Sequence, residues 1–241
     1  MRSILITGGN GGLGLGIARY FLSHDTEAKV WLGVRKNRAQ AEILSNESAG
    51  RCRMIDLEVT SPDAWRIAAE KIIEADGRID VLVNNAGLHR DCLLAAMPDD
   101  TWHSVIAANL DAVFHGCKAV VTPMMRQRFG RIVNIASLSA VLPPLGQTNY
   151  AAAKAGVVAF SQTMAKEVAR SGITVNSVLP GFIDTEALGE MDDEARKQAQ
   201  RGIPMRRFGK PEEVAAAVYF LASTEAAYIT GAALKIDGGI F

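Results

Sequence analysis

The chain has 241 residues, of which 49% are hydrophobic and 22% are charged, and its 26 Lys and Arg residues balance 26 Asp and Glu residues. This composition is typical of a soluble globular protein with a sizeable core. The balanced charge lacks the basic excess that a nucleic-acid-binding protein carries. No window reaches the roughly eighteen uninterrupted apolar residues of a membrane span. The first residues enter an apolar run without the longer apolar stretch of a signal peptide, so we expect a cytoplasmic protein.

The cysteines and histidines give no indication of a metal centre. The three cysteines, Cys52, Cys92 and Cys117, are odd in number and scattered along the chain, and the four histidines are also dispersed. A disulfide framework or a zinc site requires paired spacings that are absent here. We therefore expect ordinary thiols and no metal.

The first motif is a glycine-rich turn. An apolar run over residues 3–7 is followed by glycines between residues 8 and 14, and then by apolar residues at helical spacing. Because glycine has no Cβ, such a turn can bring backbone amides against a phosphate at the start of a helix. Between a strand and a helix, the turn predicts a dinucleotide site. The alternative is a merely flexible loop.

The second predicted strand, residues 29–34, ends where the adenosine ribose of a dinucleotide is expected to lie. An acidic residue there selects NAD by binding the ribose hydroxyls. This chain instead has Arg35, Lys36 and Arg38. Cations suit a 2′-phosphate, so NADP is predicted, with a solvated basic loop as the alternative.

Strands and helices alternate along the rest of the chain, which we expect to form one domain over residues 1–241. Further strands are predicted over 51–57, 80–84, 130–137, 172–180 and 233–237. Helices are predicted to begin near Ser61, Asp99, Tyr150 and Pro211, and Pro123 is expected to kink or end the second of them. Residues 186–209 are polar and break the rhythm, which favours a mobile lid over a cleft.

Two side chains at the start of one predicted helix indicate acid–base chemistry. Tyr150 and Lys154 are four residues apart and therefore share a helix face. A cation beside the phenol favours the phenolate, so we expect the pair to exchange a proton near neutral pH. The alternative is packing, with Tyr150 in the core and Lys154 solvated. Asn109 is polar on an apolar helix and must satisfy its amide, for a structural or a functional purpose.

Taken together, these motifs resemble the short-chain dehydrogenase/reductase family over essentially the whole chain. Within it, the chain is most similar to bacterial 3-oxoacyl-[acyl-carrier-protein] reductases, through residues 89–97, 147–156, 172–176 and 226–231. Acetoacetyl-CoA reductases share several of these passages. The resemblance implies an α/β fold with a doubly wound, parallel seven-stranded sheet in the order 3-2-1-4-5-6-7. Ligands of such sheets bind at the carboxyl ends of the strands.

The resemblance also implies the site. The catalytic residues would be Asn109, Ser137, Tyr150 and Lys154. In these roles Ser137 and Tyr150 bind the ketone oxygen, Tyr150 supplies the proton, Lys154 binds the nicotinamide ribose, and Asn109 holds a water of the proton relay. The cofactor-binding residues would include Tyr150 and Lys154 together with Gly8, Asn10, Gly11, Gly12, Leu13, Gly14, Arg35, Asp56, Leu57, Asn85, Ala86, Gly87, Pro180, Gly181, Ile183 and Thr185.

The implied reaction is reduction of a 3-oxoacyl thioester by NADPH in fatty-acid-type synthesis. The implied partners are an acyl carrier protein docking near Arg128 and Arg170, and further copies of the chain in a homotetramer. Two departures from the family pattern are Gly11, where NADP-preferring members often have Arg, and Ser171, where a basic residue is common. The alternatives are an acetoacetyl-CoA reductase, a dehydrogenase of another alcohol, sugar or steroid, and a catalytically silent nucleotide-binding subunit.

Overall fold

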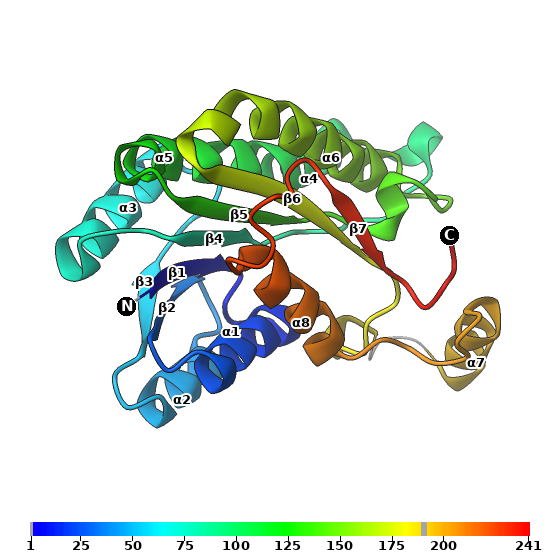
Figure 1. The fold of residues 1–241 in the computed structure, drawn as a ribbon. Helices are drawn as coiled ribbons and strands as arrows, with labels where there is room; N and C mark the ends of the chain where they lie inside the picture. Colours follow the sequence, from blue (N-terminus) through cyan, green and yellow to red (C-terminus); the bar gives the residue numbers. More distant parts are fainter. Residues whose placement is uncertain (1, 189–191) are drawn as a thin grey trace.

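The structure is a computed structural model that describes residues 2–188 and 192–241. Its centre is one sheet of seven strands in the order β3-β2-β1-β4-β5-β6-β7, and every neighbouring pair is parallel. Helices cover both faces of this sheet (Figure 1). The predicted fold class and strand order are confirmed.

The elements follow the predicted alternation. The strands are β1 (Arg2–Thr7), β2 (Ala28–Val34), β3 (Cys52–Asp56), β4 (Val81–Asn84), β5 (Gly130–Ile135), β6 (Ile173–Pro180) and β7 (Ala233–Ile236). The α-helices are α1 (Gly12–His24), α2 (Ala39–Glu47), α3 (Pro62–Asp76), α4 (Asp99–Ile106), α5 (Ala112–Gln127), α6 (Thr148–Val168), α7 (Asp193–Gly202) and α8 (Pro211–Ala222).

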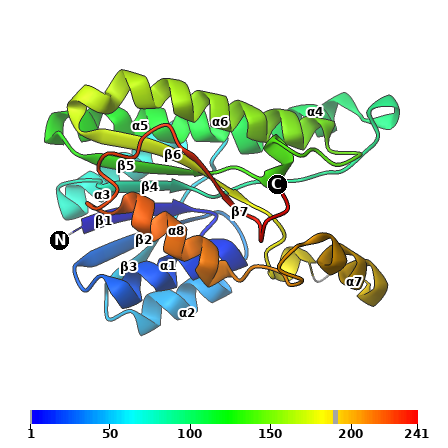
Figure 2. The same cartoon turned by 45° about the vertical axis from the view of Figure 1, so that its right-hand side comes forward.

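The core has two layers, one on each side of the sheet. Helices α1, α2 and α8 cover one face, and α3, α5 and α6 cover the other (Figures 1 and 2). In β1, Ile4 and Ile6 belong to the first layer, whereas Leu5 packs in the second with Trp65 of α3. Successive strand residues point to opposite faces, so a strand covered on both sides must be apolar throughout. This explains the continuous apolar runs of the central strands.

The helical run that begins at Asp99 is longer than a proline would normally permit. Pro123 lies inside α5, which continues to Gln127. Of the two expected effects of Pro123, a kink or an end of the helix, the end is therefore wrong. The residue after it, Met124, is fully buried against the sheet, and this packing offsets the lost backbone hydrogen bond. By length and composition Asp99–Gln127 could cross a membrane. Its apolar side, however, packs along β4, β5 and the neighbouring helices.

The segment predicted to be a lid is partly helical. It contains a short 3₁₀ turn, η5 (Glu186–Leu188), and α7, and α7 projects from the body of the molecule in both views (Figure 2). Ile203 and Phe208 are buried and anchor the chain where it returns from α7. Residues 189–191 of the predicted lid lie outside the described residues.

Candidate active site

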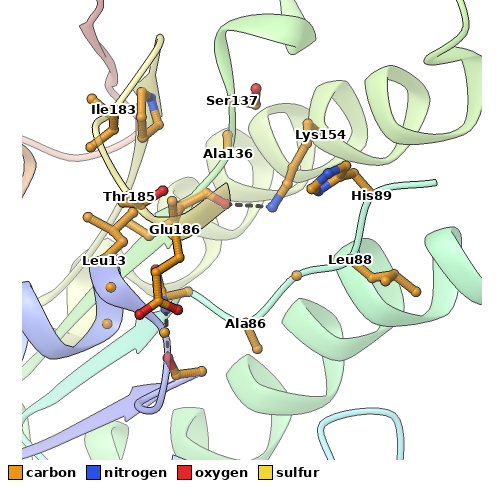
Figure 3. Close-up of a pocket in the computed structure, with 18 of the residues that line it drawn as sticks. Leu13, Ala86, Leu88, His89, Ala136, Ser137, Lys154, Ile183, Thr185 and Glu186 are labelled. Carbon is orange, nitrogen blue, oxygen red and sulfur yellow. Dashed lines mark hydrogen bonds between the residues drawn. The ribbon is translucent and has the colours of Figure 1, made fainter. Parts of the chain in front are cut away.

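A cavity of about 530 Å³ opens at the carboxyl ends of the central strands, as sheets of this kind predict. It runs from the glycine turn after β1, past the end of β5, to the start of α6 (Figure 3). The predicted site residues that line it are Gly8, Asn10, Gly11, Gly12, Leu13, Gly14, Asn85, Ala86, Gly87, Ser137, Tyr150, Lys154, Pro180, Gly181, Ile183 and Thr185.

The glycine turn is shaped to receive a phosphate group. Gly8 has a φ of +65°, and a Cβ on Gly14 would lie 2.3 Å from the carbonyl oxygen of Gly8, so a side chain at Gly14 would prevent this close approach. Helix α1 follows with Gly11 as its N-cap, which offers no side-chain capping bond, and no acidic residue stands in the first turn. The amides at this helix start are therefore suited to an anionic ligand. A dinucleotide pyrophosphate fits this turn.

The turn after β4 is fixed to the glycine turn by Thr7. The Thr7 Oγ1 atom accepts hydrogen bonds from the backbone amides of Asn85 and Ala86, each at 2.9 Å. In return, Asn85 Nδ2 donates to the Thr7 carbonyl at 2.9 Å. Asn84 instead points into the core, where its Nδ2 donates to Asn134 Oδ1 at 2.8 Å. The two turns therefore form one wall of the cavity.

A second cavity, of about 350 Å³, lies where the adenosine half of a dinucleotide is predicted. Arg35, Lys36 and Glu58 line it, and Arg35 Nη1 lies 2.7 Å from Glu58 Oε2. Burial alone would raise the pKa of Glu58, but hydrogen bonds from Arg35 and Thr60 lower it overall. The carboxylate is thus held as an anion beside the arginine.

The structure places Asp56, one of the predicted cofactor-binding residues, outside the lining of this second cavity. The side chain of Asp56 is 81% exposed and pairs with Arg38. Among the described residues, those that line this second cavity include Leu57 and Glu58 but not Asp56. Strand β3 ends at Asp56, and the chain turns into the cavity only after it. Glu58 was missed by the sequence reasoning, although its position just after the strand could have indicated it.

The structure brings Ser137, Tyr150 and Lys154 together from two elements. Ser137 follows β5 and caps a 3₁₀ turn, η3 (Leu138–Ala140), while Tyr150 lies in the first turn of α6. Lys154 Nζ lies 5.6 Å from the centroid of the Tyr150 ring. It donates a hydrogen bond to the Ile135 carbonyl at 2.8 Å (Figure 3). Both side chains line the cavity, which the packing alternative does not explain.

Burial controls the titration of this pair. It raises the pKa of Tyr150; a hydrogen bond with Ser137 opposes the rise and the negative charge of Asp91 adds to it. Burial also lowers the pKa of Lys154 to about 8. The expectation that the neighbouring cation favours the phenolate is therefore wrong in its net direction, because loss of hydration penalises the anion more. Tyr150 is a neutral proton donor at pH 7.

Asn109 is held in a widened helical turn. It is fully buried in the π-helix η2 (Ala107–Asp111), which joins α4 to α5, and such turns are frequent at functional sites. Its Nδ2 atom donates to the carbonyls of Leu88 at 2.6 Å and Val105 at 2.8 Å, and its Oδ1 accepts from the Leu88 amide at 3.3 Å. The side chain therefore clamps the turn after β4 from behind.

Several residues of the cavity wall were not singled out from the sequence. They are Leu88, His89, Ile135, Ala136, Phe182, Glu186 and Leu188. The imidazole of His89 packs edge-on against the Tyr150 ring, with centroids 6.3 Å apart. Each of these residues lies next to or within a motif that the sequence did indicate. Their position next to these motifs could have indicated that they line the cavity.

Known proteins resemble this chain over nearly its whole length. The family profile described as "Enoyl-(Acyl carrier protein) reductase" matches residues 8–240. The chain is 40% identical over 240 residues to a 3-oxoacyl-[acyl-carrier-protein] reductase of Chlamydia muridarum, covering 99% of this chain and 97% of the relative. It is 43% identical over 239 residues to the reductase of that name from Thermotoga maritima, covering 98% and 96%. The chain belongs to the short-chain dehydrogenase/reductase family.

Proposed function

We propose that this protein reduces a 3-oxoacyl thioester to the 3-hydroxyacyl product with NADPH, in fatty-acid-type synthesis. The observation that carries the proposal is that Ser137, Tyr150 and Lys154 line the same cavity as the glycine turn. Burial raises the pKa of Tyr150 there, so its phenol is neutral. A raised phenol pKa suits a proton donor, which reduction of a ketone requires. Full-length similarity to 3-oxoacyl-[acyl-carrier-protein] reductases supports the substrate class.

The residues present fit a nicotinamide dinucleotide. Gly8 to Gly14 and the start of α1 would hold the pyrophosphate, and residues 180–185 would face it across the cavity. When bound, the nicotinamide supplies the hydride. The cofactor choice between NADPH and NADH rests on Arg35 and Lys36, which suit a 2′-phosphate. Glu58 competes for Arg35, which moderates the preference.

The chain's own groups carry the proton chemistry. Ser137 and Tyr150 would both donate to the ketone oxygen, where negative charge develops, and Tyr150 would release its proton to that oxygen. Lys154, charged below about pH 8, would bind the nicotinamide ribose and stabilise the phenolate left behind. Asn109 holds the turn that carries Leu88. Its predicted role in holding a relay water stays a prediction.

A carrier protein and further copies of the chain are the proposed partners. Arg128 and Arg170 lie together, with Arg128 Nη2 donating to the Arg170 carbonyl at 3.3 Å. They stand at the opposite end of the 21-residue α6 from Tyr150, about 30 Å away at 1.5 Å per residue. Light scattering tests the tetramer, because a mass near 25.8 kDa would refute it.

Residues 186–209 form the proposed lid of a single-domain enzyme. Glu186 and Leu188 line the cavity, and Arg196 of α7 pairs with Asp184 at 2.6 Å. A lid of this kind would exclude water after the substrate enters. The cytoplasmic location also stays a prediction.

Turnover of one substrate on two carriers tests the function. NADPH oxidation would be followed with acetoacetyl groups on acyl carrier protein and on CoA, beside a panel of simple ketones and sugars. We expect the highest kcat/KM with the carrier protein. Preference for CoA would indicate an acetoacetyl-CoA reductase, and preference for a sugar or simple ketone another alcohol dehydrogenase. NADPH binding without any turnover would indicate a silent subunit.

A further inference from the structure

A hydrogen-bond chain runs beside the catalytic pair. The Ser139 amide donates to Ser137 Oγ at 3.1 Å, and Ser139 Oγ donates to Gln147 Oε1 at 3.0 Å. Gln147 Nε2 then donates to Asp91 Oδ2 at 2.8 Å. The chain connects the turn after β5, the start of α6 and the loop after β4.

The direction of this chain is determined by chemistry. An ionised carboxylate only accepts hydrogen bonds, whereas an amide side chain accepts at its oxygen and donates at its nitrogen. Asp91 therefore orients Gln147 with its oxygen toward Ser139. Ser137 Oγ accepts a hydrogen bond from the Ser139 amide. The hydroxyl proton of Ser137 therefore points away from that amide and can be donated to a ketone oxygen in the cavity.

The loop after β4 is attached to the same region at two further points. The Cys92 amide donates to the Gly146 carbonyl at 2.8 Å, and Asn149 Nδ2 donates to the Arg90 carbonyl at 3.1 Å. Asp91 is therefore kept close to Tyr150, and its negative charge opposes ionisation of the phenol. Among the described residues, the other titratable groups with a ring contact to Tyr150 are His89, from the same loop, and Lys154, from α6.

We propose that Gln147 and Asp91 are positioning residues, which act through Ser139 to hold Ser137 as a hydrogen-bond donor in the reduction. Asp91 has a second effect, because its negative charge adds to the effect of burial in raising the pKa of Tyr150. The inference rests on the proposed function, in which both hydroxyls bind the ketone oxygen.

A double-mutant cycle that exchanges the amide and the carboxylate between positions 147 and 91 tests the hydrogen-bond chain. Gln147→Glu places two carboxylates against each other, so we expect kcat on an acetoacetyl thioester to fall at least tenfold while NADPH binding is kept. Adding Asp91→Asn supplies a donor to the introduced carboxylate, and we expect most of the lost kcat to return. Additive losses in the double variant, or a normal kcat in Gln147→Glu, would overturn the proposal. Thermal unfolding of each variant controls for misfolding.

Ionisation of Tyr150 gives a second measurement that needs no substrate. The ultraviolet difference between the protein and its Tyr150→Phe variant reports that phenol as pH rises. In an Asp91→Asn background we expect the titration to move to lower pH, and the alkaline limit of kcat to move with it. Glu70→Gln, which removes an exposed charge on α3, should leave the titration unmoved. An unshifted titration in Asp91→Asn would contradict the role of the charge, whether or not the wild type reduces a 3-oxoacyl thioester.

Discussion

Buried polar groups have opposite roles at the amino ends and at the carboxyl ends of the parallel strands. On the amino side, the Asp76 carboxylate accepts hydrogen bonds from Ser3 Oγ at 3.0 Å, Trp31 Nε1 at 2.7 Å and Lys29 Nζ at 3.1 Å. The neighbouring Asp80 accepts the Ser3 amide at 2.9 Å. Here the chain satisfies its own polar groups, as buried polar groups require.

On the carboxyl side, polar groups of similar kinds face a cavity. Helix α1 begins without a side-chain cap, and Ser137 and Tyr150 turn their hydroxyl groups toward a shared space. Burial there raises the pKa of Tyr150 and lowers the pKa of Lys154, which favours the neutral form of each side chain. The comparison shows that burial alone does not mark a site. A site is the place where hydrogen-bonding capacity is directed at a ligand rather than at the chain itself.

The sharpest test of the carboxyl side is Tyr150→Phe. We expect turnover to fall by about 10²–10⁴-fold, because the general acid is lost, while NADPH binding and the melting temperature stay close to those of the wild type. Steady-state kinetics and a fluorescence titration with NADPH measure the two parts. A variant with nearly normal kcat would exclude Tyr150 as the proton donor.

The preference for NADPH over NADH should depend on the charge of the residues where the adenosine half is predicted to bind. We expect Arg35→Asp to lower the preference for NADPH over NADH by about 10- to 100-fold, since a hydrogen bond to a charged group contributes about 1.5–3 kcal/mol. Gly11→Arg is the matched gain variant, because among the described residues a Cβ at Gly11 meets only the Gly8 carbonyl oxygen, at 3.7 Å. It should raise the NADPH preference. The ratio of kcat/KM for the two cofactors decides, and a wild type that prefers NADH would refute the assignment.

At the amino ends of the strands, Asp76→Asn should lower the stability of the fold and leave kcat unchanged. We expect a loss of about 1.5–3 kcal/mol in the free energy of unfolding at pH 7. Burial raises the pKa of Asp76, but hydrogen bonds from Trp31, Lys29 and Ser3 lower it overall. Its stabilisation is therefore present above the unfolded pKa of about 3.9 and is lost as pH falls through the folded value. Urea unfolding from pH 7 to pH 3 should show the gap to the variant closing; a constant gap would contradict this.

Lys154→Met should reveal the smallest effect, a pH dependence of stability. The folded pKa of Lys154 is lowered to about 8, whereas an unfolded lysine titrates near 10.4, so between these values the unfolded chain binds more protons. Stability of the wild type should therefore rise with pH relative to the variant, by up to about 1.4 kcal/mol per pH unit. Urea unfolding at pH 7, 8 and 9 measures this. Parallel curves would show that Lys154 keeps an ordinary pKa.

Local patterns in the sequence determined the alternation of strands and helices and the glycine turn, whereas the strand order and most of the site residues followed from the resemblance to the short-chain dehydrogenase/reductase family. The apolar runs, most of them followed by a helix, predicted the alternating strands and helices, and the resemblance implied that the sheet is parallel; the structure explains the apolar runs, because strands covered on both faces must be apolar. The glycines between Gly8 and Gly14 predicted a tight turn, because residues without side chains permit it. Tyr150 and Lys154 were placed together by helix geometry alone.

Only the tertiary structure decided the electrostatics and the choice between neighbouring residues. The pKa of Tyr150 depends on burial and on Asp91, a residue from another loop, and no spacing along the chain predicts that contact. Pro123 remains within α5, where Met124 is buried against the sheet. Glu58 rather than Asp56 lines the second cavity, where the adenosine half of a dinucleotide is predicted, because the chain turns inward only after β3 ends. A sequence pattern specifies which face a residue occupies, but hydration and charge at that face depend on segments that meet only in the folded chain.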